Sequence, residues 1–301
     1  LVGSEMCIRD SYYLMDVADR IVYLDNGHIA GDWTPEQFRL LSTEKRQSMG
    51  LRALDLQDEK PICAAVPKQP PVLELQNVSL AYKKQPVLRN LSLQAAPGDI
   101  IAIVGHNGAG KTTFLEALSG QFPTRIRSGS LAADGISQRR SAEFAELVYL
   151  SSSGGTDLYP TLSAREHLSF VREAWKSAAD IDSLCDSLGI SPYLDKPTRK
   201  LSTGMKQQVK LAMAISTGCP YLILDEPLNG LDPGKRKTSC DAMRSEVARG
   251  RSVLISSHLL DDLADLTDSF YFIEAGTLVE KTESSSQTLK QEYLDTYEGG
   301  E

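Results

Sequence analysis

A glycine-rich loop between an apolar strand and a helix limits the folds open to this chain more than any other segment. The run Ile100–Val104 has the length and composition of a buried strand, and a helical pattern begins near residue 114. Between them, residues 105–113 read Gly-His-Asn-Gly-Ala-Gly-Lys-Thr-Thr and match the pattern GxxxxGK(S/T). Strand and helix patterns alternate from residue 72 onward, which predicts an α/β domain with a mainly parallel sheet.

The loop has the chemistry of a phosphate-binding site. Glycine lets backbone N–H groups approach an anion without a side-chain clash, and the N-terminus of the following helix adds the positive end of a dipole. The Lys111 side chain would reach the β and γ phosphates of a nucleotide, and the Thr112 hydroxyl would ligate Mg²⁺. The predicted phosphate-binding residues are Gly105, Asn107, Gly108, Gly110, Lys111, Thr112 and Thr113.

Two acidic residues end a second apolar run, residues 221–227, which reads Tyr-Leu-Ile-Leu-Asp-Glu-Pro. Asp225, at the strand end, is suited to hold Mg²⁺, mostly through water. Glu226 would point to the other side and could polarise the attacking water as a general base. Such a pair on its own could be solvated acids at a strand end, but the upstream phosphate loop favours the catalytic interpretation.

Together with these two sites, three further segments make the chain resemble the ATP-binding-cassette family. Residues 201–208 (Leu-Ser-Thr-Gly-Met-Lys-Gln-Gln) are similar to the family's signature motif, residues 229–233 to its D-loop, and residues 256–258 to the segment with its switch histidine. Tyr82 stands where the family stacks an aromatic ring on adenine. The resemblance covers most of residues 72–281.

The resemblance implies a role for each matching residue. Tyr82 would contact adenine, and the helix start at Ser202 and Gly204 would face the γ-phosphate bound on an opposite cassette. Asp232 would act in the D-loop and His258 as the catalytic switch histidine. Simpler interpretations exist for each: Tyr82 as an ordinary strand aromatic, Ser202 as a helix N-cap, Asp232 as a turn residue and His258 as a structural histidine. The position of His258 after an apolar strand favours the catalytic role.

The chain departs from the family pattern at two places. Thr203 and Met205 replace the glycine and glutamine of the commonest signature, which removes a side-chain amide contact but keeps the helix N-terminus. Between residues 149 and 158 the family places a glutamine that contacts Mg²⁺ and the attacking water, whereas only the serines at 151–153 are available here. We therefore expect altered coupling between the nucleotide and the membrane partner.

The resemblance implies a P-loop NTPase fold with a mainly parallel sheet, an antiparallel β subdomain and a helical signature subdomain. It places one complete ATPase domain at residues 71–290, followed by a C-terminal tail at 291–301. We interpret residues 32–70, which include a proline-rich stretch, as a linker. Residues 5–11 resemble the translation of a sequencing-library adapter, so residues 1–11 are expected to be non-native.

An internal repeat includes part of residues 12–31. Residues 19–29 (Asp-Arg-Ile-Val-Tyr-Leu-Asp-Asn-Gly-His-Ile) align with residues 268–278 (Asp-Ser-Phe-Tyr-Phe-Ile-Glu-Ala-Gly-Thr-Leu), and both predict a strand, a tight turn and a strand. Coincidence is the alternative, because any two hairpins share this outline. We favour residues 12–31 as the C-terminal remnant of a first cassette.

Composition restricts the partners. A net charge of -8 and a pI near 5.2 give no basic footprint for nucleic acid, so we expect no nucleic-acid partner. The 5 cysteines are far apart and form no C-x-x-C pair, which indicates neither a zinc site nor a disulfide framework. No apolar run approaches the roughly 18–20 residues of a membrane-spanning helix, so a membrane role requires a partner protein.

The function implied is that of an ATPase, which couples hydrolysis of ATP with Mg²⁺ to substrate transport through a separate transmembrane permease at the cytoplasmic face of the cell membrane. ATP would lie between this cassette and a second one, either fused or in a homodimer. The phosphate loop resembles that of importers and the signature that of exporters, so the direction stays open.

Two other functions of ATP-binding cassettes fit the sequence less well. One is a soluble tandem cassette acting on ribosomes; such proteins usually carry a long basic linker, unlike the short segment of mixed charge at residues 32–70. The other is a DNA-repair cassette. Such a protein is expected to contain zinc-binding cysteine pairs or a long coiled coil, and this sequence indicates neither.

Overall fold

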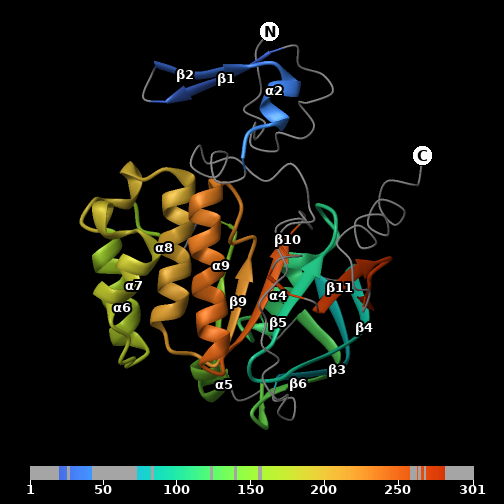
Figure 1. Cartoon of the computed structure of the whole chain (residues 1–301). Helices are drawn as coiled ribbons and strands as arrows, with labels where there is room; N and C mark the ends of the chain where they lie inside the picture. The colour runs from blue at the N-terminus through green and yellow to red at the C-terminus, as the bar shows by residue number, and fades with distance from the viewer. Residues whose placement is uncertain are drawn as a thin grey trace. The chain divides into compact units, whose positions relative to one another are not determined.

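The computed structural model describes residues 20–25, 28–42, 73–82, 85–122, 125–138, 141–154, 158–257, 263, 266–267 and 269–281. By their contacts they divide into a smaller N-terminal unit, from residues 1–60 together with residues 232–236, and a larger unit, from residues 61–231 and 237–301. Figure 1 labels many of the elements of both units.

A six-stranded, mainly parallel sheet forms the centre of the larger unit (Figure 1). Its strands run in the order β12, β11, β5, β10, β9 and β8, and all neighbours are parallel except β11 and β12. Every residue of β5, β9 and β10 is buried, which explains why β5 and β9 are near-continuous apolar runs. The strands are β5 (Ile100–Val104), β8 (Val148–Ser151), β9 (Tyr221–Asp225), β10 (Ser252–Ser257), β11 (Ser269–Glu274) and β12 (Thr277–Lys281).

A second, antiparallel sheet confirms the predicted β subdomain. Its order is β4, β3, β6 and β7, with every neighbouring pair antiparallel. The strands are β3 (Leu73–Tyr82), β4 (Gln85–Ala95), β6 (Ile126–Ala133) and β7 (Ile136–Ser137).

Three helices form the predicted helical subdomain. Both α6 (Ala164–Ala174) and α7 (Ile181–Leu188) contact α8 (Thr203–Ser216), and each of the three begins at a serine or aspartate whose side chain caps it. The other elements are α4 (Lys111–Leu118), α5 (Ser141–Leu147), α9 (Pro233–Ala248) and the 3₁₀ turns η2 (Ser191–Tyr193) and η3 (Thr198–Lys200). None of the helices in the described part of the chain is both long and apolar enough to span a membrane.

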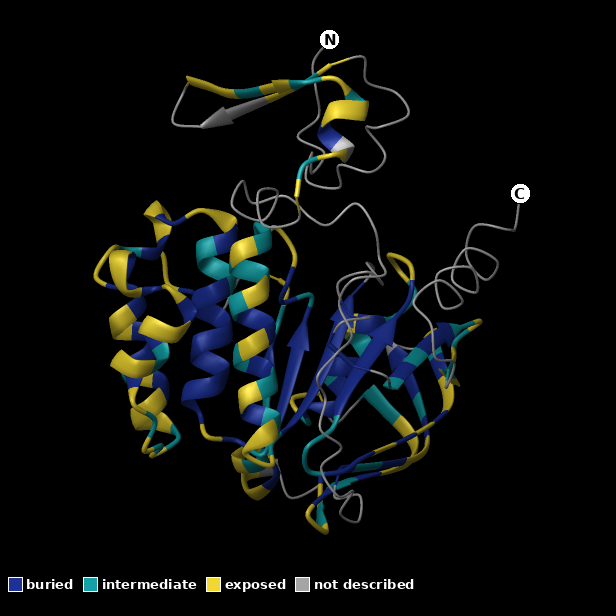
Figure 2. Cartoon of the chain, viewed as in Figure 1, coloured by how far each residue is buried: buried dark blue, intermediate teal, exposed yellow. Residues whose placement is uncertain are grey.

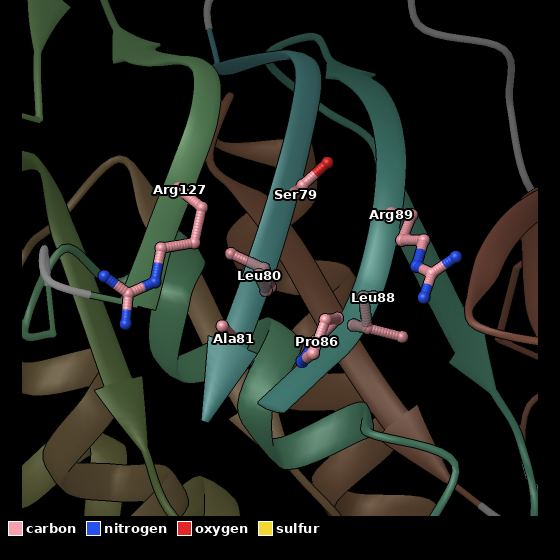
Figure 3. Close-up of a pocket in the computed structure, with 7 residues that line it drawn as sticks. All are labelled: Ser79, Leu80, Ala81, Pro86, Leu88, Arg89 and Arg127. Carbon is pink, nitrogen blue, oxygen red and sulfur yellow. The ribbon is translucent and has the colours of Figure 1, made fainter. Parts of the chain in front are cut away.

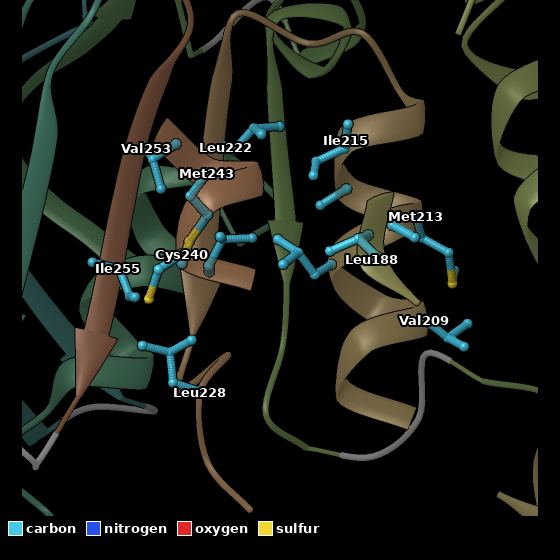
Figure 4. Close-up of a cluster of buried hydrophobic side chains, with 14 of the residues drawn as sticks. Leu188, Val209, Met213, Ile215, Leu222, Leu228, Cys240, Met243, Val253 and Ile255 are labelled. Atoms are coloured by element: carbon cyan, nitrogen blue, oxygen red, sulfur yellow. The ribbon is translucent and has the colours of Figure 1, made fainter. Parts of the chain in front are cut away.

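The central sheet separates two hydrophobic cores. Along β5, Ile100, Ala102 and Val104 belong to one core and Ile101 and Ile103 to the other, as the alternation of a strand requires. The first core joins the sheet to α8 and α9 (Figure 4), and the second joins it to α4 and the antiparallel sheet. Figure 2 shows the central strands buried throughout. β5 is therefore fixed from both faces, and so is the start of the loop that follows it.

The N-terminal unit contains the hairpin predicted from its sequence. β1 (Ile21–Asp25) pairs with β2 (His28–Trp33), and the short helix α2 (Pro35–Arg39) follows. The side chain of Thr34 caps this helix through a reciprocal capping box with Gln37.

This hairpin pairs its residues near the turn in the same register as its predicted repeat. Leu24 pairs with Ile29, and the equivalent Ile273 pairs with Leu278. The assignment of residues 12–31 to a first cassette stays a prediction. The turn at 26–27, the linker beyond residue 42, the C-terminal tail and residues 1–11 lie outside the described residues.

Candidate nucleotide-binding site

The loop after β5 carries the predicted phosphate-binding residues into the first turn of α4. Its backbone enters the left-handed region at Gly108 (φ 88°) and Gly110 (φ 106°), where a side chain would be strained. A Cβ at Gly110 would also lie 3.3 Å from the side chains of Val87 and Leu88. The loop geometry therefore requires glycine at both positions.

Lys111, the first residue of α4, is buried and folds back over this loop. Its Nζ donates to the carbonyl oxygens of Gly105 at 2.7 Å and His106 at 3.3 Å, and it lies 3.8 Å from Glu226 Oε1. Burial lowers the pKa of the Lys111 ammonium, and the nearby carboxylates of Glu226 and Asp225 only partly offset this effect. An anion bound at the loop would compensate for the lost hydration, so Lys111 is suited to bind phosphate.

The buried carboxylate of Asp225, at the end of β9, accepts hydrogen bonds from three hydroxyl groups. Thr112 Oγ1 donates to Oδ2 at 2.9 Å, and Ser153 Oγ donates to the same atom at 2.6 Å. Ser256 Oγ donates to Oδ1 at 2.5 Å. The two residues predicted from sequence to hold the metal, Thr112 and Asp225, are thus in direct contact.

Glu226 follows with a left-handed backbone (φ 49°), which is uncommon for a residue other than glycine. Its N–H donates to Ser256 Oγ at 3.0 Å, and its carbonyl accepts from Gln207 Nε2 at 2.9 Å. These two bonds hold a strained backbone, and such strain is concentrated at functional sites. The Glu226 carboxylate is thereby directed toward the Lys111 ammonium.

The first turn of α8 contains the predicted signature residues. Ser202 is exposed, and its Oγ accepts from the Met205 N–H at 3.2 Å, so the expected N-cap is confirmed. Gly204 is buried, and a Cβ there would lie only 2.9 Å from the carbonyl oxygen of Gly230. The start of α8 therefore packs closely against the predicted D-loop.

Two further contacts tie α8 to the site, and sequence reasoning missed both. Besides the bond from Gln207 to Glu226, the buried Lys210 donates from Nζ to the carbonyl oxygen of Ser152 at 2.9 Å. The next residue, Ser153, bonds to Asp225. The one signal in the sequence was the run of serines after β8, and it becomes informative only when β8 is known to lie beside β9.

Tyr82 ends β3, and its side chain lies outside the described residues. Its neighbour Ala81 pairs with Pro86 of β4, and both line a pocket on the antiparallel sheet (Figure 3). Figure 3 shows Arg127 and Arg89 on the strands to either side of β3. The predicted adenine contact stays a prediction, next to a hollow in the surface.

Asp232 and His258 complete the predicted set. Asp232 precedes α9, where its Oδ1 accepts from the Lys235 N–H at 2.9 Å, so within this chain it caps a helix. His258 lies outside the described residues, directly after the last residue of β10.

The donor set around Asp225 fits a magnesium ion bound with a nucleotide. Mg²⁺ takes oxygen ligands and keeps several waters, and the hydroxyls of Thr112 and Ser153 with the Asp225 carboxylate supply hard oxygen donors at one point. The Lys111 ammonium lies near the carboxylates of Asp225 and Glu226. The arrangement can therefore hold a triphosphate and its metal, with Glu226 available to accept a proton.

Comparisons with known proteins agree with this geometry. A family model described as ABC transporter matches residues 88–229. The lantibiotic transport ATP-binding protein SrtF of Streptococcus pyogenes is 30% identical over 224 residues, which cover 73% of this chain and 95% of that protein. A putative ABC transporter ATP-binding protein of Treponema denticola is 26% identical over 305 residues, covering 99% of this chain and 62% of that protein.

A solved structure of the ATP-binding subunit of an ABC transporter has a TM-score of 0.67 and 26% identity, and the match covers 74% of this chain and 99% of that one. The named relatives are transporter proteins, which favours a transporter over a cassette acting on ribosomes. The chain belongs to the ATP-binding-cassette family, as an ATP-binding ATPase subunit of a transporter.

Proposed function

We propose that this subunit binds ATP with Mg²⁺ at Lys111, Thr112, Asp225 and Glu226, and that hydrolysis there drives a separate transmembrane permease. The observation that carries the proposal is the convergence of these four side chains at the ends of β5 and β9. Thr112 Oγ1 lies 2.9 Å from Asp225 Oδ2, and Lys111 Nζ lies 3.8 Å from Glu226 Oε1.

Each side chain has a task that follows from its surroundings. Lys111 would exchange its two carbonyl acceptors for phosphate oxygens, because hydrogen bonds between charged groups are stronger than those to neutral carbonyls. Thr112 and Asp225 would hold the metal, which when bound neutralises phosphate charge. Glu226 would accept a proton from the attacking water. The oxygen of that water would bond to the γ-phosphorus while the bond from this phosphorus to the β–γ bridging oxygen breaks.

The start of α8 supports pairing with a second cassette, either fused or as a homodimer. Ser202 is exposed, and a helix N-terminus attracts anions through its N–H groups and its dipole. A triphosphate held by the second cassette would be bound between the two. Transport subunits among the relatives support a permease partner and a place at the cytoplasmic face of the cell membrane.

The test is hydrolysis and binding by purified protein carrying Glu226→Gln. The amide keeps the size of the side chain but accepts no proton, so ATP should still bind while phosphate release slows at least about 100-fold. Glu173→Gln, on the exposed side of α6, is the matched control and should turn over normally.

Unchanged turnover in Glu226→Gln would remove that residue from its role. A wild-type protein without magnesium-dependent affinity for ATP, even when a partner cassette is supplied, would overturn the proposal as a whole.

A further inference from the structure

Of the serines that follow β8, one is in contact with the metal-site carboxylate. Ser153 Oγ donates to Asp225 Oδ2 at 2.6 Å, and the same oxygen atom accepts from Thr112 Oγ1 at 2.9 Å. The two hydroxyl oxygens thus share one acceptor atom. Ser153 comes from the loop after β8 and Thr112 from the first turn of α4, so distant segments of the chain meet at this atom.

The loop that carries Ser153 is held on both sides of it. The buried Lys210 of α8 donates to the Ser152 carbonyl oxygen at 2.9 Å, and the Gly154 N–H donates to Ser152 Oγ at 3.1 Å. These bonds position the Ser153 hydroxyl, whose side chain has only one torsion left to set its direction. A hydroxyl fixed in this way is preorganised for a ligand, as a metal site requires.

We propose that Ser153 is a metal ligand of this ATPase site, contributing its hydroxyl oxygen to the Mg²⁺ shell beside Thr112 and Asp225 when nucleotide is bound. The inference rests on the proposed function. Mg²⁺ prefers hard oxygen donors, and serine supplies one at the point where the other two predicted metal-site residues already touch. The hydroxyl bond to Asp225 then keeps the donor in place before the metal arrives.

The first experiment measures binding, not turnover. The affinity of the full chain for a non-hydrolysable ATP analogue is measured with excess Mg²⁺ and again with a chelator. Ser153→Ala should lower the affinity with Mg²⁺ about tenfold and leave the chelator value unchanged, because loss of a partner in a metal site typically costs 10- to 100-fold. Ser153→Thr keeps the hydroxyl and should stay near wild type.

Ser152→Ala is the comparison for loop structure, because it removes the bond from Gly154 that helps to hold the loop and leaves the Ser153 hydroxyl in place. The bond from Lys210 to the Ser152 carbonyl oxygen remains, so the affinity with Mg²⁺ should fall clearly less than in Ser153→Ala, by no more than about threefold. An equal loss in Ser152→Ala and Ser153→Ala, or an equal loss with and without Mg²⁺, would assign Ser153 to loop structure and overturn the inference.

A second experiment replaces the hydroxyl by a thiol. Thiolate prefers softer metals, so Ser153→Cys should raise the ratio of affinities measured with Cd²⁺ and with Mg²⁺ at least about tenfold over wild type. A purely structural serine would leave this ratio unchanged, and that result would also overturn the inference. Failure of the proposed function looks different, because wild-type protein would then show no magnesium-dependent binding at all.

Discussion

Two regions of the proposed ATPase site differ in how many of their contacts come from within one chain. At the carboxyl ends of β5 and β9, Lys111 and Asp225 are buried and have polar partners from other elements. At the start of α8, Ser202 is exposed and its hydrogen bond to Met205 lies within its own helix. The first region keeps its geometry by itself, whereas the second presents a helix N-terminus outward. Such a difference fits the proposed pairing of two cassettes.

The difference also separates binding from pairing in experiments. A change in the buried region should affect the affinity of a single chain for nucleotide. A change at the exposed helix start should leave that affinity alone and affect only the association of two cassettes.

The largest effect is expected from Lys111→Met, which keeps the length of the side chain and removes its charge. Loss of a hydrogen-bonded charge costs about 1.5–3 kcal/mol, so ATP affinity should fall about 10- to 100-fold. The unfolding midpoint should not fall, because burial of the ammonium is itself unfavourable, as its lowered pKa indicates. The measurements are nucleotide titration and urea unfolding, with the exposed Lys196→Met as control.

Ser202→Asp should weaken pairing at least about tenfold while leaving single-chain affinity unchanged. Aspartate is as good an N-cap as serine, so the free energy of unfolding should change by less than about 0.5 kcal/mol. Its charge would nevertheless face the triphosphate of the second cassette, and like charges at an interface oppose association. Sedimentation with ATP in a Glu226→Gln background measures pairing.

Ser202→Ala is the companion variant to Ser202→Asp. It removes the cap, which costs about 1 kcal/mol of stability, without adding charge. If the aspartate and alanine variants paired equally well, the exposed helix start would not face a phosphate.

Gly204→Ala tests whether the outward-facing region depends on packing inside the chain. The new Cβ would lie 2.9 Å from the Gly230 carbonyl oxygen, so the helix start must shift. Overpacking costs about 1–3 kcal/mol, and the better helix propensity of alanine returns up to about 1 kcal/mol. We expect a net loss of about 1–2 kcal/mol in urea unfolding.

Gly234→Ala is the matched control for Gly204→Ala. Gly234 is also the second residue of its helix, and its Cβ would meet Asp232 Oδ1 only at 3.4 Å, an ordinary contact. Equal stability of the two variants would show that the start of α8 is not fixed against Gly230.

Much of this architecture was predictable because its signals are local. The strand before Gly105, the strand before Asp225 and the N-cap at Ser202 each follow from a few neighbouring residues, and all are confirmed. The hairpin at the N-terminus was found in the same way.

The contacts that were missed join residues far apart in sequence. Ser153 and Asp225 are 72 positions apart, and Lys210 is 58 positions from Ser152. Which strand ends meet depends on the order of β8, β9 and β10 in the sheet, which apolar periodicity does not reveal. The left-handed backbone of Glu226 was equally hidden, because its cause is a pair of tertiary hydrogen bonds.

The smallest predicted effect is a pH dependence of nucleotide affinity that arises from Lys111. Its pKa lies below that of an exposed lysine, chiefly because of burial, and a bound phosphate would raise it. As pH rises through the pKa of the free protein, binding must therefore take up a proton, and affinity should fall several-fold toward the alkaline end. Titrations from neutral pH up to about pH 10.4, where an exposed lysine loses its proton, measure this fall. Lys111→Arg keeps its charge throughout this range, so its affinity, whatever its absolute value, should stay flat. Parallel profiles for the two proteins would mean that the wild-type decline comes from another group. The protonation of the buried Lys111 would then not distinguish the region at the ends of β5 and β9 from the exposed start of α8.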